Sequence, residues 1–231
     1  MALILALDTT AEACSVALLH HDQLLERIER EPRQHTRRAM PLTRELLAEA
    51  GITVKQLDAI AFGCGPGSFT GLRIAAGLAQ GLALGAGLPV IQVSSLAAVA
   101  HQVFRQHADA SRVAVAFDAR MDEVYWGCYQ REGDAVVLMD EERVCPPEAV
   151  SLPEGEGLWT GAGDGWRYRA RMPQAVTDRV DPVLEEAVPL AADVARLGLL
   201  GWQAGEGVAA EQAQPVYLRD QVAWKKLPGR D

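Results

Sequence analysis

The sequence predicts an α/β protein that is built from two related lobes, and three observations support this prediction. First, an apolar run (59–62) leads through a glycine-rich turn into a long apolar helix. Second, a shift of 110 residues brings the strand pattern of 3–28 onto that of 113–138 without a gap. Third, the alternating glycines of 63–67 recur at 161–165 behind another short strand pattern. The matched order of these elements indicates a duplication.

Each copy opens with three expected strands. The first is an apolar run that ends in an aspartate, Asp8 in one copy and Asp118 in the other. A second strand, a tight turn and a third strand follow. The expected strands are 3–8, 14–19 and 24–28 in the first copy and 113–118, 124–129 and 134–138 in the second. In the second copy, Trp126 is expected in the core, while Tyr125 and Tyr129 are left open as core residues or as a stacking surface for a base.

The first helix is expected from about Thr36 to Gly51, with Pro41 in its early part. Its buried side chains are expected to be Met40, Leu46, Leu47 and Ala50. Arginines gather before and within this helix, and this favours a solvated face over a surface for phosphate or an acidic partner. They are Arg27, Arg30, Arg33, Arg37, Arg38 and Arg44.

The second helix, over 70–87, carries a line of glycines four residues apart. These are Gly77, Gly81 and Gly85, and a parallel line holds alanines 75, 79 and 83. The helix has almost no polar face, so it must be covered nearly all round. Each helical glycine costs about 1 kcal/mol relative to alanine, which close approach of another backbone can offset. The spacing leaves open whether that backbone belongs to the chain's own sheet or to another subunit. A last helix is expected over 193–207, with Val194 on its apolar side.

Composition restricts the class of protein. The chain has 231 residues and a net charge of −9, so as a whole it repels nucleic acid. Its four cysteines are scattered, which predicts packed thiols in a reduced, cytoplasmic protein. No apolar run reaches membrane-spanning length, and Met1 leads directly into a strand where a signal peptide would lie.

Five segments carry a resemblance to the bacterial TsaB (YeaZ) family of tRNA threonylcarbamoyladenosine biosynthesis proteins. They are 3–15 (LILALDTTAEACS), 65–73 (GPGSFTGLR), 80–84 (QGLAL), 118–126 (DARMDEVYW) and 215–226 (PVYLRDQVAWKK). The resemblance implies an actin-like, sugar-kinase-like (ASKHA) fold of two duplicated lobes, each with a central mixed sheet flanked by helices. It places the first lobe at 1–107 and the second at 108–189. The C-terminal helix and tail, about 190–231, are then expected to pack back on the first lobe.

The resemblance also implies a role without catalysis. The chain would bind and activate the TsaD-type transferase that makes threonylcarbamoyladenosine (t6A) in tRNA, and it would meet a TsaE-type ATPase through that complex. Alone it would form a homodimer through the same helices, and it would contact tRNA only indirectly and no membrane. The expected partner interface comprises Met40, Leu47, Arg73, Gly77, Gly81 and Gly85.

An independent ATPase or phosphotransferase is the main alternative. Kinases with an actin-like fold have glycines after each strand-end aspartate, where the backbone wraps phosphates. Here neither Asp8 nor Asp118 is followed by glycine, so both are expected to cap their own loops. The resemblance leaves open an adenine nucleotide with Mg, bound weakly or shared at an interface. The residues nearest to it would be Asp8, Thr9, Thr10, Gly65, Gly67 and Ser68.

Two further enzyme classes lack the residues that they need. A glycoprotease-like metallopeptidase would carry an H-x-x-x-H pair after the strand that follows the glycine loop, but Ser95 and Val99 stand in those positions. No two of the five histidines are four residues apart, so no metal site is expected. Ser68 lies in P-G-S-F-T-G and not in a G-x-S-x-G elbow, so it is expected to cap a helix. No catalytic residue is expected.

Overall fold

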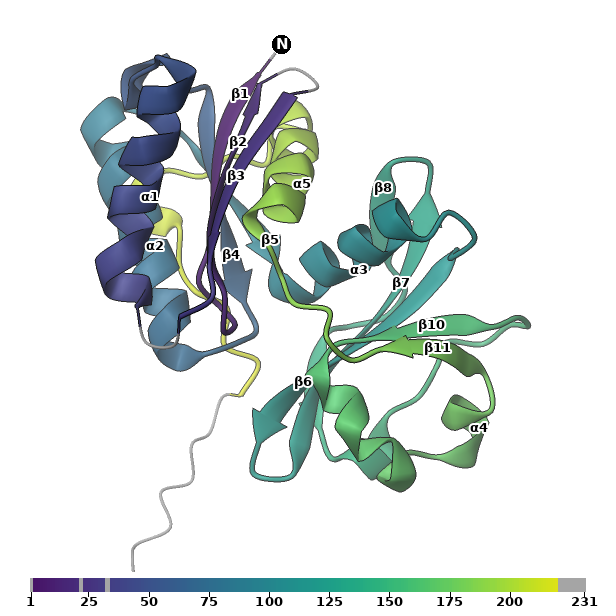
Figure 1. Ribbon diagram of the computed structural model, residues 1–231. Coiled ribbons are helices and arrows are strands. Elements are labelled where there is room, and N and C mark those ends of the chain that lie inside the picture. Colours follow the sequence, from purple (N-terminus) through teal and green to yellow (C-terminus); the bar gives the residue numbers. More distant parts are fainter. Residues whose placement is uncertain (1, 21–22, 32–33, 220–231) are drawn as a thin grey trace, which may run out of the picture.

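The computed structural model describes residues 2–20, 23–31 and 34–219, which fold into two sheets with helices around them (Figure 1). The first sheet has five strands in the order β3-β2-β1-β4-β5. The second has the order β11-β10-β6-β7-β8, and β9 pairs with β7 outside that path. The first sheet comprises β1 (Leu3–Asp8), β2 (Cys14–His20), β3 (Gln23–Glu29), β4 (Ala59–Gly65) and β5 (Val90–Ser94). The second comprises β6 (Arg112–Arg120), β7 (Glu123–Glu132), β8 (Ala135–Leu138), β9 (Arg143–Cys145), β10 (Trp159–Ala162) and β11 (Val180–Leu184).

The two sheets repeat one topology, which confirms the predicted duplication and fold class. In each lobe the first strand pairs antiparallel with the second, β1 with β2 and β6 with β7. In each lobe the same strand pairs in parallel with the strand before the alternating glycines, β4 or β10. The outermost parallel strands are β5 and β11. A mixed sheet therefore forms the centre of both lobes.

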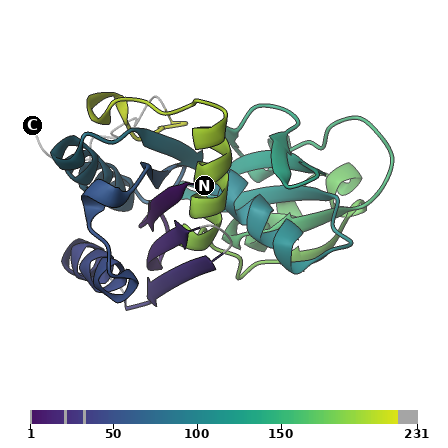
Figure 2. The ribbon, with the colours of Figure 1, turned by 90° about the horizontal axis from the view of Figure 1, so that it is seen from above.

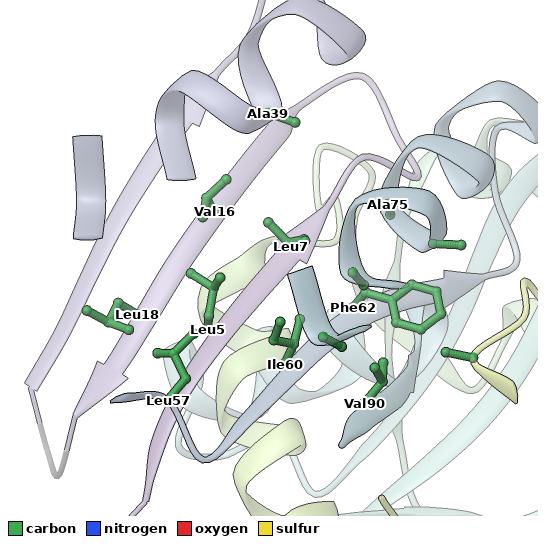
Figure 3. Close-up of a cluster of buried hydrophobic side chains, with 14 of the residues drawn as sticks. Leu5, Leu7, Val16, Leu18, Ala39, Leu57, Ile60, Phe62, Ala75 and Val90 are labelled. Carbon is green, nitrogen blue, oxygen red and sulfur yellow. The ribbon is translucent and has the colours of Figure 1, made fainter. Parts of the chain in front are cut away.

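Helices cover both faces of the first sheet. Helices α1 (His35–Ala50) and α2 (Phe69–Ala86) lie on its outer face, where their buried side chains share a core with alternate residues of β1, β2 and β4 (Figure 3). Helix α5 (Ala191–Gln203) lies on the face that is turned toward the second lobe (Figures 1 and 2). Glycine at position 198 lets the helix approach the sheet closely, since a Cβ there would be 2.5 Å from the Cβ of Ala61. This helix was predicted over 193–207, so it begins two residues earlier and ends four residues earlier than expected.

Helix α3 (Ser95–Gln106) lies where the two lobes meet. It follows the last strand of the first sheet, yet its buried side chains, among them Val99 and Val103, cluster with Val113 and Tyr129 of the second sheet. It also contacts α5. The short α4 (Gln174–Thr177) and four 3₁₀ segments complete the second lobe and the connections.

Helix α1 begins one residue before the predicted start and ends, as predicted, before Gly51, whose φ of 67° is left-handed. Leu46 and Leu47 are buried as expected, but Met40 and Ala50 are only half-buried. The buried positions next to Met40 are instead Ala39, Leu42 and Thr43. The prediction for Met40 was wrong because the buried stripe of the helix begins at Ala39, and the next residue lies at the edge of that stripe.

All four cysteines are buried and unpaired, as predicted. Burial raises the pKa of each thiol, to about 12 at Cys64 and Cys128. Within the described ranges, no helix combines the length and the apolar character that a membrane crossing requires.

Candidate functional site

The loops after β1 and β4 meet at one end of the first sheet, because these parallel strands are neighbours. Asp8 ends β1, and its fully buried carboxylate accepts hydrogen bonds from the backbone N–H of Thr10 at 3.0 Å and from the Thr10 hydroxyl. The Thr10 Oγ1 in turn lies 3.1 Å from the hydroxyl of Ser95 at the start of α3. The expectation that Asp8 caps its own loop is therefore confirmed.

The glycine-rich turn 63–68, called the glycine loop, is filled by the turn that residues 8–10 form after β1. A Cβ on Gly63 would be 2.0 Å from Oδ2 of Asp8, and one on Gly67 would be 2.5 Å from the carbonyl oxygen of Thr10. The backbone N–H of Ser68 donates to that same carbonyl at 2.7 Å. Glycine is needed at both positions because a side chain there would clash with the turn formed by residues 8–10.

Ser68 is the N-cap of α2, as predicted, because its Oγ accepts the N–H of Gly71 at 3.3 Å. Thr9 also binds this helix, since its hydroxyl donates to the carbonyl of Gly71 at 2.7 Å. A pocket of about 300 Å³ opens beside these residues, between the first turns of α1 and α2. It is lined by Thr9, His35, Thr36, Ser68, Thr70, Gly71 and Ile74.

Burial raises the pKa of Asp8 to about 7, against 3.8 for an exposed aspartate, although the hydrogen bonds from Thr10 act in the opposite direction. The folded state therefore holds a proton that the unfolded chain releases. Its contribution to stability is complete below about pH 4 and is lost as the pH rises through about 7.

We expect Asp8→Asn to remove this pH dependence, since the amide oxygen still accepts from Thr10 and no charge is buried. Between pH 5 and pH 8 the variant should gain on the order of 2 kcal/mol of unfolding free energy relative to the parent. Urea unfolding at the two pH values measures this gain. Asn at the exposed Asp109 is the matched control and should follow the parent, and a variant at position 8 that also followed it would contradict the prediction.

Asp118, the counterpart of Asp8, also caps its own loop, because its Oδ1 accepts the N–H of Arg120 at 2.9 Å. Arg120 and Arg167 flank the other oxygen at 3.0 and 3.7 Å. The turn that follows has three successive non-glycine residues with positive φ, at positions 120 to 122. Such backbone costs of order 1 kcal/mol or more per residue.

The two small-residue lines of α2 have opposite environments. Ala75, Ala79 and Ala83 are buried against the sheet. The glycines at 77, 81 and 85 are exposed, and a Cβ on any of them would meet nothing within 4 Å. The chain's own sheet therefore does not contact the glycine line, and of the two possibilities that the spacing left open, contact with another subunit stays a prediction.

The residues of the expected partner interface are not all available at the surface. Arg73 is exposed on the same helix as the glycine line. Leu47 is only 7% exposed and belongs to the core of the first lobe, so it is withdrawn from the contact set. Met40 is half-buried on α1. The remaining contact set is called the α2 face below: Arg73, Gly77, Gly81 and Gly85.

The stacking surface that was considered on β7 is wrong for Tyr129. This side chain is 1% exposed, and its hydroxyl donates to Glu142, which also accepts from Ser94 at the end of β5. Burial raises the pKa of Glu142. Trp126 lies in the core as predicted. Glu142 therefore links Ser94 of the first lobe to Tyr129 of the second. The sequence around Glu142 did not indicate this link, because both partners are distant in sequence.

The surroundings of Val99 and of the arginine cluster agree with the structural roles that the sequence favoured. Val99 packs in the core. In the part of the chain that the structure describes, no three His, Cys, Asp or Glu side chains lie close enough to hold a metal ion. Arg27 pairs with Glu49 and Arg38 with Glu29, which fits a solvated basic face. Arg33 of that cluster lies outside the described residues.

The C-terminal segment 213–219 was missed as part of the site, and it is called the strap below. Its Val216 N–H donates to the carbonyl of Cys64 at 2.8 Å, and its Arg219 side chain bonds to the second lobe at Glu123. The strap thus crosses the glycine loop from one lobe to the other (Figure 1, yellow). The mixed aromatic and basic composition of 215–226 was the available signal. The rest of the tail that was expected to pack on the first lobe, 220–231, lies outside the described residues.

Comparisons with known proteins give a consistent result. A family model described as TsaD, tRNA N6-adenosine threonylcarbamoyltransferase, matches residues 29–225. The chain is 43% identical to the tRNA threonylcarbamoyladenosine biosynthesis protein TsaB of Escherichia coli over 233 residues, with 99% of each chain covered. It is 40% identical to TsaB of Haemophilus influenzae, with 99% of this chain and 98% of that one covered. Among solved structures, YeaZ from Pseudomonas aeruginosa is 51% identical with a TM-score of 0.89, and the match covers 94% of this chain and all of the other.

Proposed function

Because the chain belongs to the TsaB (YeaZ) family of tRNA threonylcarbamoyladenosine biosynthesis proteins, we propose that it is the non-catalytic subunit that binds and activates a TsaD-type transferase. The α2 face, with the adjoining part of α1, is the proposed contact surface. Alone, the chain would form a homodimer through the same surface. A TsaE-type ATPase would join through the complex, and tRNA would be contacted indirectly in the cytoplasm.

The exposed glycine line is the observation that carries this proposal. Three glycines in a helix interior cost about 3 kcal/mol relative to alanine. No contact in the described chain offsets this cost, since a Cβ at each position would meet open space. Close approach of a partner's backbone is what a line of small residues permits. Helices α1 and α2 form the outermost layer of the first lobe, so a partner can reach them (Figure 2).

The surroundings of the candidate residues support a role without catalysis. The glycine loop is filled by the 8–10 turn, Ser68 caps a helix, and Val99 occupies a position where a metallopeptidase of this superfamily would need a ligand. An adenine nucleotide shared with the partner stays a prediction, and the pocket between α1 and α2 is lined in part by Ser68 at the end of the glycine loop.

Reconstitution tests the proposal. The purified chain is mixed with the TsaD-type and TsaE-type proteins of the same organism, threonylcarbamoyl-adenylate and unmodified tRNA, and t6A is measured by mass spectrometry. We expect modification only when the chain is present, and none from the chain alone. Modification by the chain alone, or an unchanged yield without it, would refute the proposal. Mg-ATP turnover by the isolated chain that is lost in Asp8→Asn would instead favour an independent ATPase.

A further inference from the structure

Exposed apolar side chains gather where the strap crosses between the lobes. The described residues have eight large apolar side chains that are exposed, and four of them belong to three adjoining segments. These four are Phe69 at the start of α2, Met121 in the turn after β6, and Val216 and Tyr217 in the strap, with exposures of 56, 63, 39 and 42%. Together with Arg73 they are called the strap patch below.

Contacts within the patch hold its parts together. The rings of Phe69 and Tyr217 have centroids 5.8 Å apart. The Arg73 guanidinium lies 3.7 Å over the Phe69 ring, and its Nε–H donates to the Tyr217 hydroxyl at 3.2 Å. Two residues beyond Tyr217, Arg219 reaches Met121 Sδ at 2.8 Å and the carbonyl of Ala119 at 3.2 Å. The strap therefore links Phe69 and Arg73 of the first lobe to Met121 of the second.

Two features of the patch indicate what a partner would have to provide. Met121 is the middle residue of the three with positive φ, so a strained turn presents an apolar side chain to solvent. Arg73 has no carboxylate partner within the residues that the structure describes. A binding partner would remove the apolar Met121 side chain from water. The same partner would have to supply an acceptor for Arg73, because a guanidinium that loses water needs one.

The position of the patch identifies the partner that would cover it. Arg73 belongs both to the patch and to the α2 face, and Gly77 follows one helical turn later. The α2 face is lined by glycine and so offers little apolar area, whereas a stable interface buries about 800 Å² on each side and depends on a few aromatic or arginine anchors. Phe69, Tyr217 and Arg73 are side chains of that kind, directly next to it.

We propose that the TsaD-type partner covers the strap patch together with the α2 face and presents a carboxylate to Arg73. This inference rests on the proposed function and extends it. The contact then includes both lobes and the strap, so that the bound partner also fixes the arrangement of the two lobes.

Affinity measurements with the full-length chain test this proposal. The dissociation constant for the purified TsaD-type subunit is measured by calorimetry for Tyr217→Ala and Met121→Ala, and we expect a rise of about tenfold in each. Leu158→Ala is the matched control, since this leucine is 66% exposed but lies by the opposite end of β6 from Met121. It should bind within twofold of the parent. Arg73→Gln should weaken binding and reduce its dependence on salt concentration.

The design separates failure of this inference from failure of the proposed function. If the patch variants bind as the parent does while Gly81→Leu does not bind, the patch lies outside the interface and only the inference fails. If Gly81→Leu also binds normally, the α2 face is not the contact surface either. If the parent itself does not bind the TsaD-type subunit, the proposed function fails. Thermal melting shows whether Tyr217→Ala loosens the strap. Met121→Ala is an independent test of the patch, because Met121 belongs to the second lobe and not to the strap.

Discussion

Replacing Gly81 by leucine is expected to abolish assembly with the TsaD-type subunit while the chain itself stays folded. A Cβ at this position meets nothing within 4 Å, so the larger side chain fits the monomer. Leucine also favours a helix over glycine by nearly 1 kcal/mol, so the melting temperature should rise slightly. In the complex, the added side chain would hold the two backbones apart, and we expect the affinity to fall at least about 100-fold.

The measurement is size-exclusion chromatography of the mixed proteins, with calorimetry for the affinity. Gly81→Ala should show an intermediate loss of binding together with a similar gain in stability. Gln203→Leu is the matched control, because it adds an exposed leucine at the end of α5, on the opposite face of the same sheet. Normal assembly of Gly81→Leu would show that the glycine line is not a contact surface.

Gly71→Ala is expected to have the largest effect on stability, with a loss of about 3 kcal/mol or more. A Cβ at position 71 would be 1.8 Å from the carbonyl oxygen of Thr9, which is backbone and has little freedom to move. That carbonyl belongs to the turn that fills the glycine loop, so the clash would force the turn and the start of α2 apart. In a chain of this size the melting temperature should fall by roughly 10 °C.

Gly77→Ala is the matched control, because it makes the same chemical change less than two turns further along α2. Its Cβ would point into open space, so this variant should gain about 1 kcal/mol. Thermal melting of both variants at one pH measures the difference. Equal effects of the two substitutions would show that the packing described around the 8–10 turn is wrong.

Fold class, the succession of strands along each repeat and the cap residues were predictable from the sequence because they depend on local patterns. Apolar runs, turn residues and their repetition indicated the elements of both lobes. Asp8 and Ser68 each bond within two or three residues of themselves, so their roles follow from the residue type and its immediate neighbours. The family resemblance rested on such short segments as well.

For the predicted partner interface, the sequence did not distinguish exposed residues from buried ones. The spacing of Gly77, Gly81 and Gly85 showed that they share a line on α2, but the direction of that line depends on how the helix is rotated against its sheet. Ala75 and Ala79, which are equally small, lie on the buried side. Leu47 was misassigned for the same reason: the apolar pattern of α1 does not distinguish a core contact from a partner contact.

The sequence by itself determined the duplicated α/β lobes, the family and the lack of an H-x-x-x-H pair, since these depend on residue identity and on periodicity along the chain. Only the tertiary structure decided that the 8–10 turn fills the glycine loop, that the glycine line of α2 faces outward, and that the strap joins the lobes at Met121. These facts depend on contacts between residues tens to hundreds of positions apart, such as Gly71 with Thr9 and Arg219 with Glu123. Such contacts leave no periodic trace, because their geometry exists only after the sheets and helices have packed.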